Sequence, residues 1–172
     1  MFVLYSLVNH LNSPKMKRNH IIHLDDTDKR ILSILLLDGK RPYAEIGKEL
    51  FLSAGTVHVR IKKMIDAGVI TGSHIEVDYK SLGYDITAFL GIYLEKSSLY
   101  SQVIEELNGI GEVVSAHYTT GNYGIFAKII VRDTDHLRDV LSNKIQKIKG
   151  IQRTETFISL EESIERPLNV DL

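Results

Sequence analysis

The most restrictive feature of the sequence is the order of hydrophobic patterns between residues 86 and 160. Segments with the continuous or alternating apolar residues of strands are interleaved with amphipathic helical segments, in the order strand, helix, strand, strand, helix, strand. The strands are expected at 86–94, 112–120, 123–132 and 151–160, and the helices at 98–109 and 134–149. This order predicts a ferredoxin-like βαββαβ domain.

The predicted sheet is apolar on both of its faces. Leu90 and Ile92 of the first strand point to one face, while Phe89 and Tyr93 point to the other. Two helices can cover only one face of a four-stranded sheet, so the second face needs a partner. We therefore expect a homodimer that forms through the sheet.

The N-terminal segment 24–70 has a different pattern, with three amphipathic helical stretches. Asp25 or Asp26 is expected to cap the first helix, Pro42 to occupy the first position of the second, and Ser53 to cap the third. Only a very short turn separates the second and third helices. This pattern predicts a helix-turn-helix, so the overall fold class is α+β.

The third helix carries the candidate DNA-binding residues. Val57, Ile61, Met64 and Ile65 are expected to face the core, and the remaining face is small, polar and basic. A helix of this kind fits the major groove, where arginine can read guanine and lysines can contact phosphates. The candidates are Ser53, Gly55, Thr56, His58, Arg60, Lys62 and Lys63. The alternative is an ordinary solvated basic face.

Two further segments flank this unit. Residues 71–85 alternate at Ile75, Val77 and Tyr79, which predicts a linker strand or small wing. Residues 1–23 are expected to be an extension outside the fold. Residues 1–15 are expected to be either disordered or a mis-assigned start, because Met16 opens a second plausible start. A signal peptide is not expected.

Composition narrows the possible functions. The 172 residues carry a net charge of −1, which divides into +3 for residues 1–80 and −4 for residues 81–172. A basic N-terminal half can approach a polyanion. Cysteine is absent, which excludes disulfides, zinc-thiolate sites and a cysteine nucleophile. The seven histidines are scattered without ligand spacing. We therefore expect no catalytic residues, no metal, no cofactor and no membrane span, and a cytoplasmic protein.

The strings LDDTDKRIL, PYAEIGKEL and LSAGTVHVRIKKMIDAGVITG, followed by YTTGNYGIF and ISLEESI, resemble the Lrp/AsnC (feast/famine) family of transcriptional regulators. The similarity runs from about Leu24 to about Arg166 and is strongest to the asparagine-responsive branch. The resemblance implies a winged helix-turn-helix that binds double-stranded DNA, joined to a sensor domain at 86–172. It also implies dimers that assemble into octamers or larger particles associated with the nucleoid, and an amino-acid effector.

The resemblance further implies where the effector binds. The implied residues are Tyr118, Thr119, Thr120, Gly121, Asn122 and Tyr123 in the turn between the second and third strands, with Thr154 and Thr156 on the last strand. Many family members have an acid where this chain has Gly124, and its absence favours a small neutral amino acid such as asparagine. Two alternatives remain: these residues serve only a hairpin turn and a strand, or the chain binds amino acids and acts through protein contacts.

Overall fold

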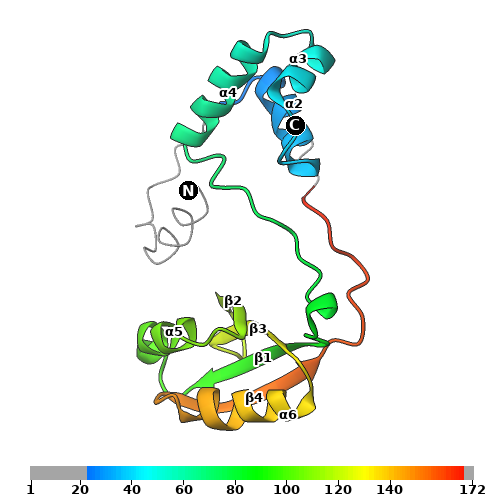
Figure 1. Cartoon of the computed structure of the whole chain (residues 1–172). Coiled ribbons are helices and arrows are strands. Elements are labelled where there is room, and N and C mark those ends of the chain that lie inside the picture. The colour runs from blue at the N-terminus through cyan, green and yellow to red at the C-terminus, as the bar shows by residue number, and fades with distance from the viewer. Residues whose placement is uncertain (1–22, 169–172) are drawn as a thin grey trace. The chain divides into compact units, whose positions relative to one another are not determined.

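The computed structural model describes residues 23–168, which form a helical unit up to His74 and an α+β unit at Ile75–Arg166 (Figure 1). The predicted fold class is confirmed: helix-turn-helix elements are followed by a four-stranded antiparallel sheet with helices. The predicted N-terminal extension lies outside the described residues, except for His23. Within the described part of the chain, no helix is long and apolar enough to cross a membrane.

The helical unit consists of α2 (Asp26–Leu37), α3 (Tyr43–Leu50) and α4 (Ala54–Asp66). A capping box starts α2: the Asp25 carboxylate accepts a hydrogen bond from the Asp28 amide at 2.8 Å, and the Asp28 carboxylate accepts one from the Asp25 amide at 3.4 Å. These contacts satisfy backbone N–H groups that have no partner within the helix. The N-terminus expected from the acidic sequence is therefore confirmed.

The core of the helical unit lies between the three helices. Its fully enclosed side chains are Ile31, Ile46, Val57, Ile61 and Met64. Gly47 allows the short α3–α4 turn, because a Cβ atom there would lie 2.6 Å from the Leu52 carbonyl oxygen. Two details of the prediction are wrong. Ile65 is half exposed, and Pro42 precedes the first residue of α3 instead of being that residue.

The sheet of the second unit has the order β2-β3-β1-β4. Its strands are β1 (Ile86–Leu94), β2 (Val113–Tyr118), β3 (Ile125–Val131) and β4 (Ile151–Ile158), and every pairing is antiparallel. Helix α5 (Tyr100–Asn108) joins β1 to β2. The strand order is that of the predicted ferredoxin-like arrangement.

The connection from β3 to β4 is a helical segment that changes its winding. Helix α6 (Thr134–Asp139) continues as a π-helical turn at Val140–Lys144 and a 3-10 turn at Ile145–Lys147. The α5 and α6 segments pack against one face of the sheet, where Leu90, Ile92, Val103, Leu107, Val140 and Ile145 are buried. The other face carries Phe89 and Phe126, whose stacked rings have centroids 5.9 Å apart.

The connections differ from two expectations. The strand predicted around Ile75 and Val77 does not form; residues 71–78 are without regular structure and lead to a 3-10 turn at Lys80–Leu82. A strand requires a hydrogen-bonded neighbour, and residues 23–168 provide none here. The β2–β3 connection also has six residues, 119–124, instead of the predicted two-residue turn. Gly121 in this connection has a positive φ of 113°.

Candidate DNA interface and ligand pocket

The N-terminal end of α4 presents small polar groups to solvent. The Ser53 hydroxyl accepts a hydrogen bond from the Thr56 amide at 3.0 Å, and the two hydroxyl oxygens lie 2.8 Å apart. Ser53, Gly55, Thr56 and His58 are all exposed. An exposed helix N-terminus combines free N–H groups with the positive end of the helix dipole, a combination that favours contact with phosphate.

The basic part of this surface lies further along α4. Lys62 is exposed and makes no ion pair within residues 23–168, so its ammonium group is available to an anionic partner. Lys63 is also exposed, but its Nζ lies 3.5 Å from the Asp28 carboxylate. Six of the seven predicted DNA contacts are therefore exposed residues of α4 or of its N-cap, Ser53.

Arg60 does not belong to that surface, and the prediction that it faces outward to read guanine is not supported by its contacts. Its Nη1 lies 2.6 Å from Asp25 Oδ2 and 2.7 Å from Asp28 Oδ1. Position 60 lies at the edge of the buried stripe, three residues after Val57 and four before Met64, and its side chain is 28% exposed. The sequence did not indicate these two ion pairs, and the guanine contact of Arg60 stays a prediction that they do not support.

Val59 is the residue of this surface that the sequence analysis missed. Its side chain is 65% exposed, although it is apolar. Position 59 is three residues before Lys62 and therefore lies on the same face of α4. An apolar side chain in the major groove can contact the thymine methyl group. The sequence does contain a signal for this residue: Val59 is apolar, yet its position does not fit the helical spacing of the buried residues Val57, Ile61 and Met64.

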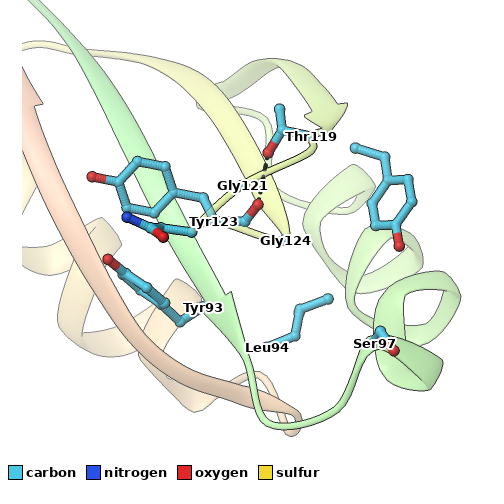
Figure 2. Close-up of a pocket in the computed structure, with 9 residues that line it drawn as sticks. Tyr93, Leu94, Ser97, Thr119, Gly121, Tyr123 and Gly124 are labelled. Carbon is cyan, nitrogen blue, oxygen red and sulfur yellow. Dashed lines mark hydrogen bonds between the residues drawn. The ribbon is translucent and has the colours of Figure 1, made fainter.

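The described part of the sheet domain contains a pocket at the β2–β3 connection (Figure 2). Its volume is about 220 Å³. The lining residues are Tyr93, Leu94, Ser97, Tyr118, Thr119, Gly121, Asn122, Tyr123 and Gly124. In Figure 2, Tyr93 and Tyr123 lie on one side, Ser97 lies on the other, and Leu94 lies between them. Five of the eight predicted effector residues line this pocket.

Hydrogen bonds shape the loop that lines the pocket. The Thr119 hydroxyl donates to the Tyr123 carbonyl oxygen at 2.7 Å, and the Thr119 amide donates to the Gly124 carbonyl at 3.3 Å (Figure 2). The Gly124 amide in turn donates to the Ile92 carbonyl at 3.0 Å, which ties the loop to β1. The loop is therefore a preformed wall of the pocket.

Tyr123 connects the pocket to the aromatic face of the sheet. Its ring lies over Gly91, where a Cβ atom would be 2.4 Å from the ring, and its hydroxyl donates to Glu155 at 2.7 Å. The Tyr93 hydroxyl donates to the same carboxylate at 3.1 Å. The hydrogen bond to Glu155 raises the pKa of Tyr123 to about 12 and, as the main cause, lowers the pKa of Glu155. Tyr123 thus stays neutral at physiological pH.

Three predicted effector residues are not in the pocket lining. Thr120 lies in the loop but does not line the pocket. Thr154 and Thr156 pair with Ile92 and Leu90, so they share the helix-covered face of the sheet. Tyr123 contacts the opposite face. Within one chain, the structure does not bring these two threonines to the Tyr123 side of the pocket.

The pocket lining has no charged side chain. The hydroxyls of Ser97 and Thr119 and the amide of Asn122 can donate and accept hydrogen bonds, and the tyrosine rings supply apolar surface. Such a set suits a small neutral molecule with both polar and apolar parts. Residues 23–168 hold no group of three or more side chains able to ligate a metal.

Comparison with known proteins identifies the class of protein that these two units form. Residues 24–71 match the family model of a winged helix-turn-helix DNA-binding domain, and residues 87–168 match the Lrp/AsnC ligand-binding domain. The chain belongs to the Lrp/AsnC family of DNA-binding transcriptional regulators, so it is not an enzyme.

The similarity to individual members covers most of the chain. Regulatory protein AsnC of Haemophilus influenzae is 44% identical over 146 residues, which are 85% of this chain and 97% of that protein. The same protein from Escherichia coli K12 is 45% identical over 145 residues, 84% of this chain and 95% of the relative. The solved structure of E. coli AsnC superposes with a TM-score of 0.81, covering 86% of this chain and 99% of that one.

Proposed function

We propose that this regulator binds specific DNA sequences through the outward surface of α4 and that a small neutral amino acid, asparagine, binds in the pocket at the β2–β3 connection and modulates DNA binding or assembly. The observation that carries the proposal is the pocket itself, because it is lined by five effector residues expected from the family resemblance and has no charged side chain. The proposal for DNA uses Ser53, Gly55, Thr56, His58, Val59, Lys62 and Lys63.

The DNA proposal is supported by the charge and exposure of α4. Lys62 is exposed without an ion-pair partner among the described residues, and Thr56 and Val59 lie beside it on the surface. A phosphate contact and base-edge contacts are therefore available on one helix. Arg60 is left out of the DNA contacts because Asp25 and Asp28 already hold its guanidinium group.

The asparagine proposal is supported by the pocket's size and neutrality. A volume of about 220 Å³ is smaller than the pockets typical of drug-sized ligands, which begin at roughly 300 Å³. An aspartate or lysine side chain would find no charged partner in the lining, whereas a carboxamide can exchange hydrogen bonds with Ser97 or Asn122. Thr154 and Thr156 remain candidates only if a second copy brings them to the site.

We also propose that a second copy covers the aromatic face of the sheet, in a dimer that assembles further into octamers in the cytoplasm, associated with the nucleoid. Phe157 on this face is 47% exposed, and Phe89 and Phe126 stack beside it. An apolar sheet face with no helix packed on it favours a self-complementary interface.

The experiment is DNA footprinting of the full chain on the DNA upstream of its own gene and upstream of asparagine-metabolism genes, with and without asparagine. We expect a protected region whose extent or affinity changes with asparagine but not with aspartate. Protection that is the same with and without asparagine would contradict asparagine as the effector but would still support specific DNA binding. Absence of protection at low salt, where phosphate contacts are strongest, would contradict specific DNA binding and favour action through protein contacts.

A pair of loop variants tests the pocket. Thr119→Val removes the hydroxyl that donates to the Tyr123 carbonyl, whereas Thr120→Val changes a neighbouring loop residue outside the lining. Calorimetry should show asparagine affinity reduced about tenfold for Thr119→Val, the effect of roughly one lost hydrogen bond. Thr120→Val should bind like the native chain. Equal affinities of all three proteins would rule out this pocket.

A further inference from the structure

The carboxylates at the start of α2 form an internal clamp on α4. Asp28 is fully buried, and its Oδ1 lies 2.7 Å from Arg60 Nη1. Asp25 Oδ2 lies 2.6 Å from the same nitrogen. Lys63 Nζ is 3.5 Å from the second oxygen of Asp28. The clamp is therefore the set Asp25, Asp28, Arg60 and Lys63, and it joins two elements more than 30 residues apart in sequence.

A capping residue alone does not require this arrangement. Asp25 and Asp28 already complete a capping box with each other's amides at the start of α2. A buried carboxylate is costly unless a cation or hydrogen-bond donors compensate it, and Arg60 supplies both. The hydrogen bond from Arg60 is the main cause that lowers the pKa of Asp25, and the same contact raises the pKa of Arg60. Both groups are thus charged at neutral pH.

The location of the clamp on α4 is what connects it to DNA. Arg60 lies one residue from Val59 and two from Lys62, which are on the outward surface. The apolar contacts of Val57 and Ile61 resist separation of α4 from the core but are non-directional. The two short hydrogen bonds that Arg60 donates to Asp25 and Asp28 are charge-assisted and directional, so they favour one rotation of α4 against the core.

We propose that Arg60 is a positioning residue for DNA recognition: held by Asp25 and Asp28, it sets the rotation of α4 about its own axis and so aims Val59 and Lys62 at the DNA. This inference rests on the proposed DNA surface of α4. It assigns Arg60 no contact with base or phosphate, because reading guanine would require the guanidinium group to give up its short contacts with Asp25 and Asp28.

The test compares Arg60→Met with the double variant Asp28→Asn/Arg60→Met, and uses Lys62→Met as the control for a phosphate contact. The double variant has the same net charge as the native chain, and the carboxamide introduced by Asp28→Asn would keep an oxygen for the Asp25 amide. Binding is measured by fluorescence anisotropy over a series of KCl concentrations. The probes are a duplex selected in vitro by the native protein and a scrambled duplex of equal length.

We expect Arg60→Met to reduce affinity for the selected duplex by at least about tenfold. The double variant should regain stability, because no buried carboxylate is left uncompensated, but should stay about as weak in binding, because the contact that orients α4 is still absent. The double variant should keep the native dependence of log K on log salt concentration on both duplexes. Lys62→Met should lower that slope by about 0.9 on both, the effect of one phosphate contact.

Three results would overturn the positioning role. The first is a folded double variant that binds with native affinity, which would mean that the unpaired Asp28 and not the lost orientation weakens Arg60→Met. The second is a double variant whose salt slope falls by about 0.9. The third is unchanged affinity of Arg60→Met. If Arg60→Met does not fold, Arg60→Lys replaces it: selection with this variant should return the native sequence preference, and relaxed preference at a single base pair would make Arg60 a base reader. If neither the native protein nor any variant prefers the selected duplex to the scrambled one, the result contradicts the proposed function, specific DNA binding by α4.

Discussion

Each of the two units contains a carboxylate that contacts a lysine and a second basic side chain distant in sequence, and these two carboxylates differ in burial and in what their partners do. Asp28 in the helical unit is completely buried and contacts Arg60 and Lys63 of α4. Glu112 in the sheet domain has a side chain that is 15% exposed and contacts His136 and Lys144. Both carboxylates tie a helical segment to a neighbouring element.

The geometry at Glu112 indicates a structural anchor. Lys144 Nζ lies 2.7 Å and His136 Nε2 lies 3.1 Å from its Oε1. The backbone amide of Arg132 donates to His136 Nδ1, so Nε2 of the neutral ring bears the proton and donates to Glu112. Partial burial alone would raise the pKa of Glu112, but hydrogen bonds from Lys144 and His136 lower it to about 2.

The comparison teaches that similar ion pairs acquire different roles from their location. Neither Glu112 nor its partners line the ligand pocket, so this anchor stabilises the domain without touching the proposed effector. The partners of Asp28 lie on the helix that carries the proposed DNA contacts. Damage at Asp28 or Arg60 should therefore affect stability and DNA binding together, whereas damage at Glu112 should affect stability alone.

The largest expected effect is from Arg60→Met. Removing one member of a buried ion pair usually costs about 3–5 kcal/mol, and we expect about 3 kcal/mol because Lys63 still lies near Asp28. Hydrogen exchange of the α2 and α4 amides measures the loss within the helical unit. Lys62→Met is the matched control and should change stability by less than about 0.5 kcal/mol. If the α2 and α4 amides exchange equally slowly in both variants, Asp28 is stable without Arg60 and the contrast drawn between Asp28 and Glu112 is wrong.

The second effect is from Glu112→Gln and depends on pH. Because the folded-state pKa of about 2 is below the ordinary value of 4.5, ionised Glu112 contributes its full stability above pH 4.5 and loses it as the pH falls towards 2. At pH 7 we expect a loss of about 1.5–3 kcal/mol, the range for hydrogen bonds to charged groups. Urea unfolding at pH 7, 4.5 and 3 should show a smaller pH dependence for the variant than for the native chain. If the free energy of unfolding changes with pH by the same amount in both proteins, the ionisation of Glu112 is not linked to folding. An altered DNA affinity of the variant at pH 7 would contradict its purely structural role.

The smallest effect concerns two of the positions with positive φ, one in each unit. In the helical unit this position is Phe51, which has a φ of 58° and an almost fully exposed ring. In the sheet domain it is Gly121, which has a φ of 113°. A non-glycine residue is sterically strained in this region, so Phe51→Gly should stabilise the helical unit by roughly 0.5–1 kcal/mol. Gly121→Ala should destabilise the sheet domain for the same reason. A rise in melting temperature for the first and a fall for the second are the expected results; a Phe51→Gly chain that melts lower would show that the ring stabilises the turn.

Much of the fold could be predicted from the sequence because its signals are local. The cap residues Asp25 and Ser53 and the alternation in β1 each depend on neighbours within a few positions. The loop at 118–123 could be predicted as a ligand site only through the family resemblance, because its residues alone indicate no more than a turn. The linker at 71–78 could not be predicted as irregular, since its alternation is strand-like. Its irregular form follows from the absence of a pairing strand among the residues that the structure describes.

By itself, the sequence determined the class of elements, their order and the ends of most of them, because capping, helical period and strand alternation act over one or two turns of chain. Only the tertiary structure decided that Arg60 faces two carboxylates and that Thr154 and Thr156 lie on the sheet face opposite the Tyr123 ring. The physical reason is that an ion pair and a strand register are contacts between residues 30 or more positions apart, and their geometry exists only after the helices and strands have packed.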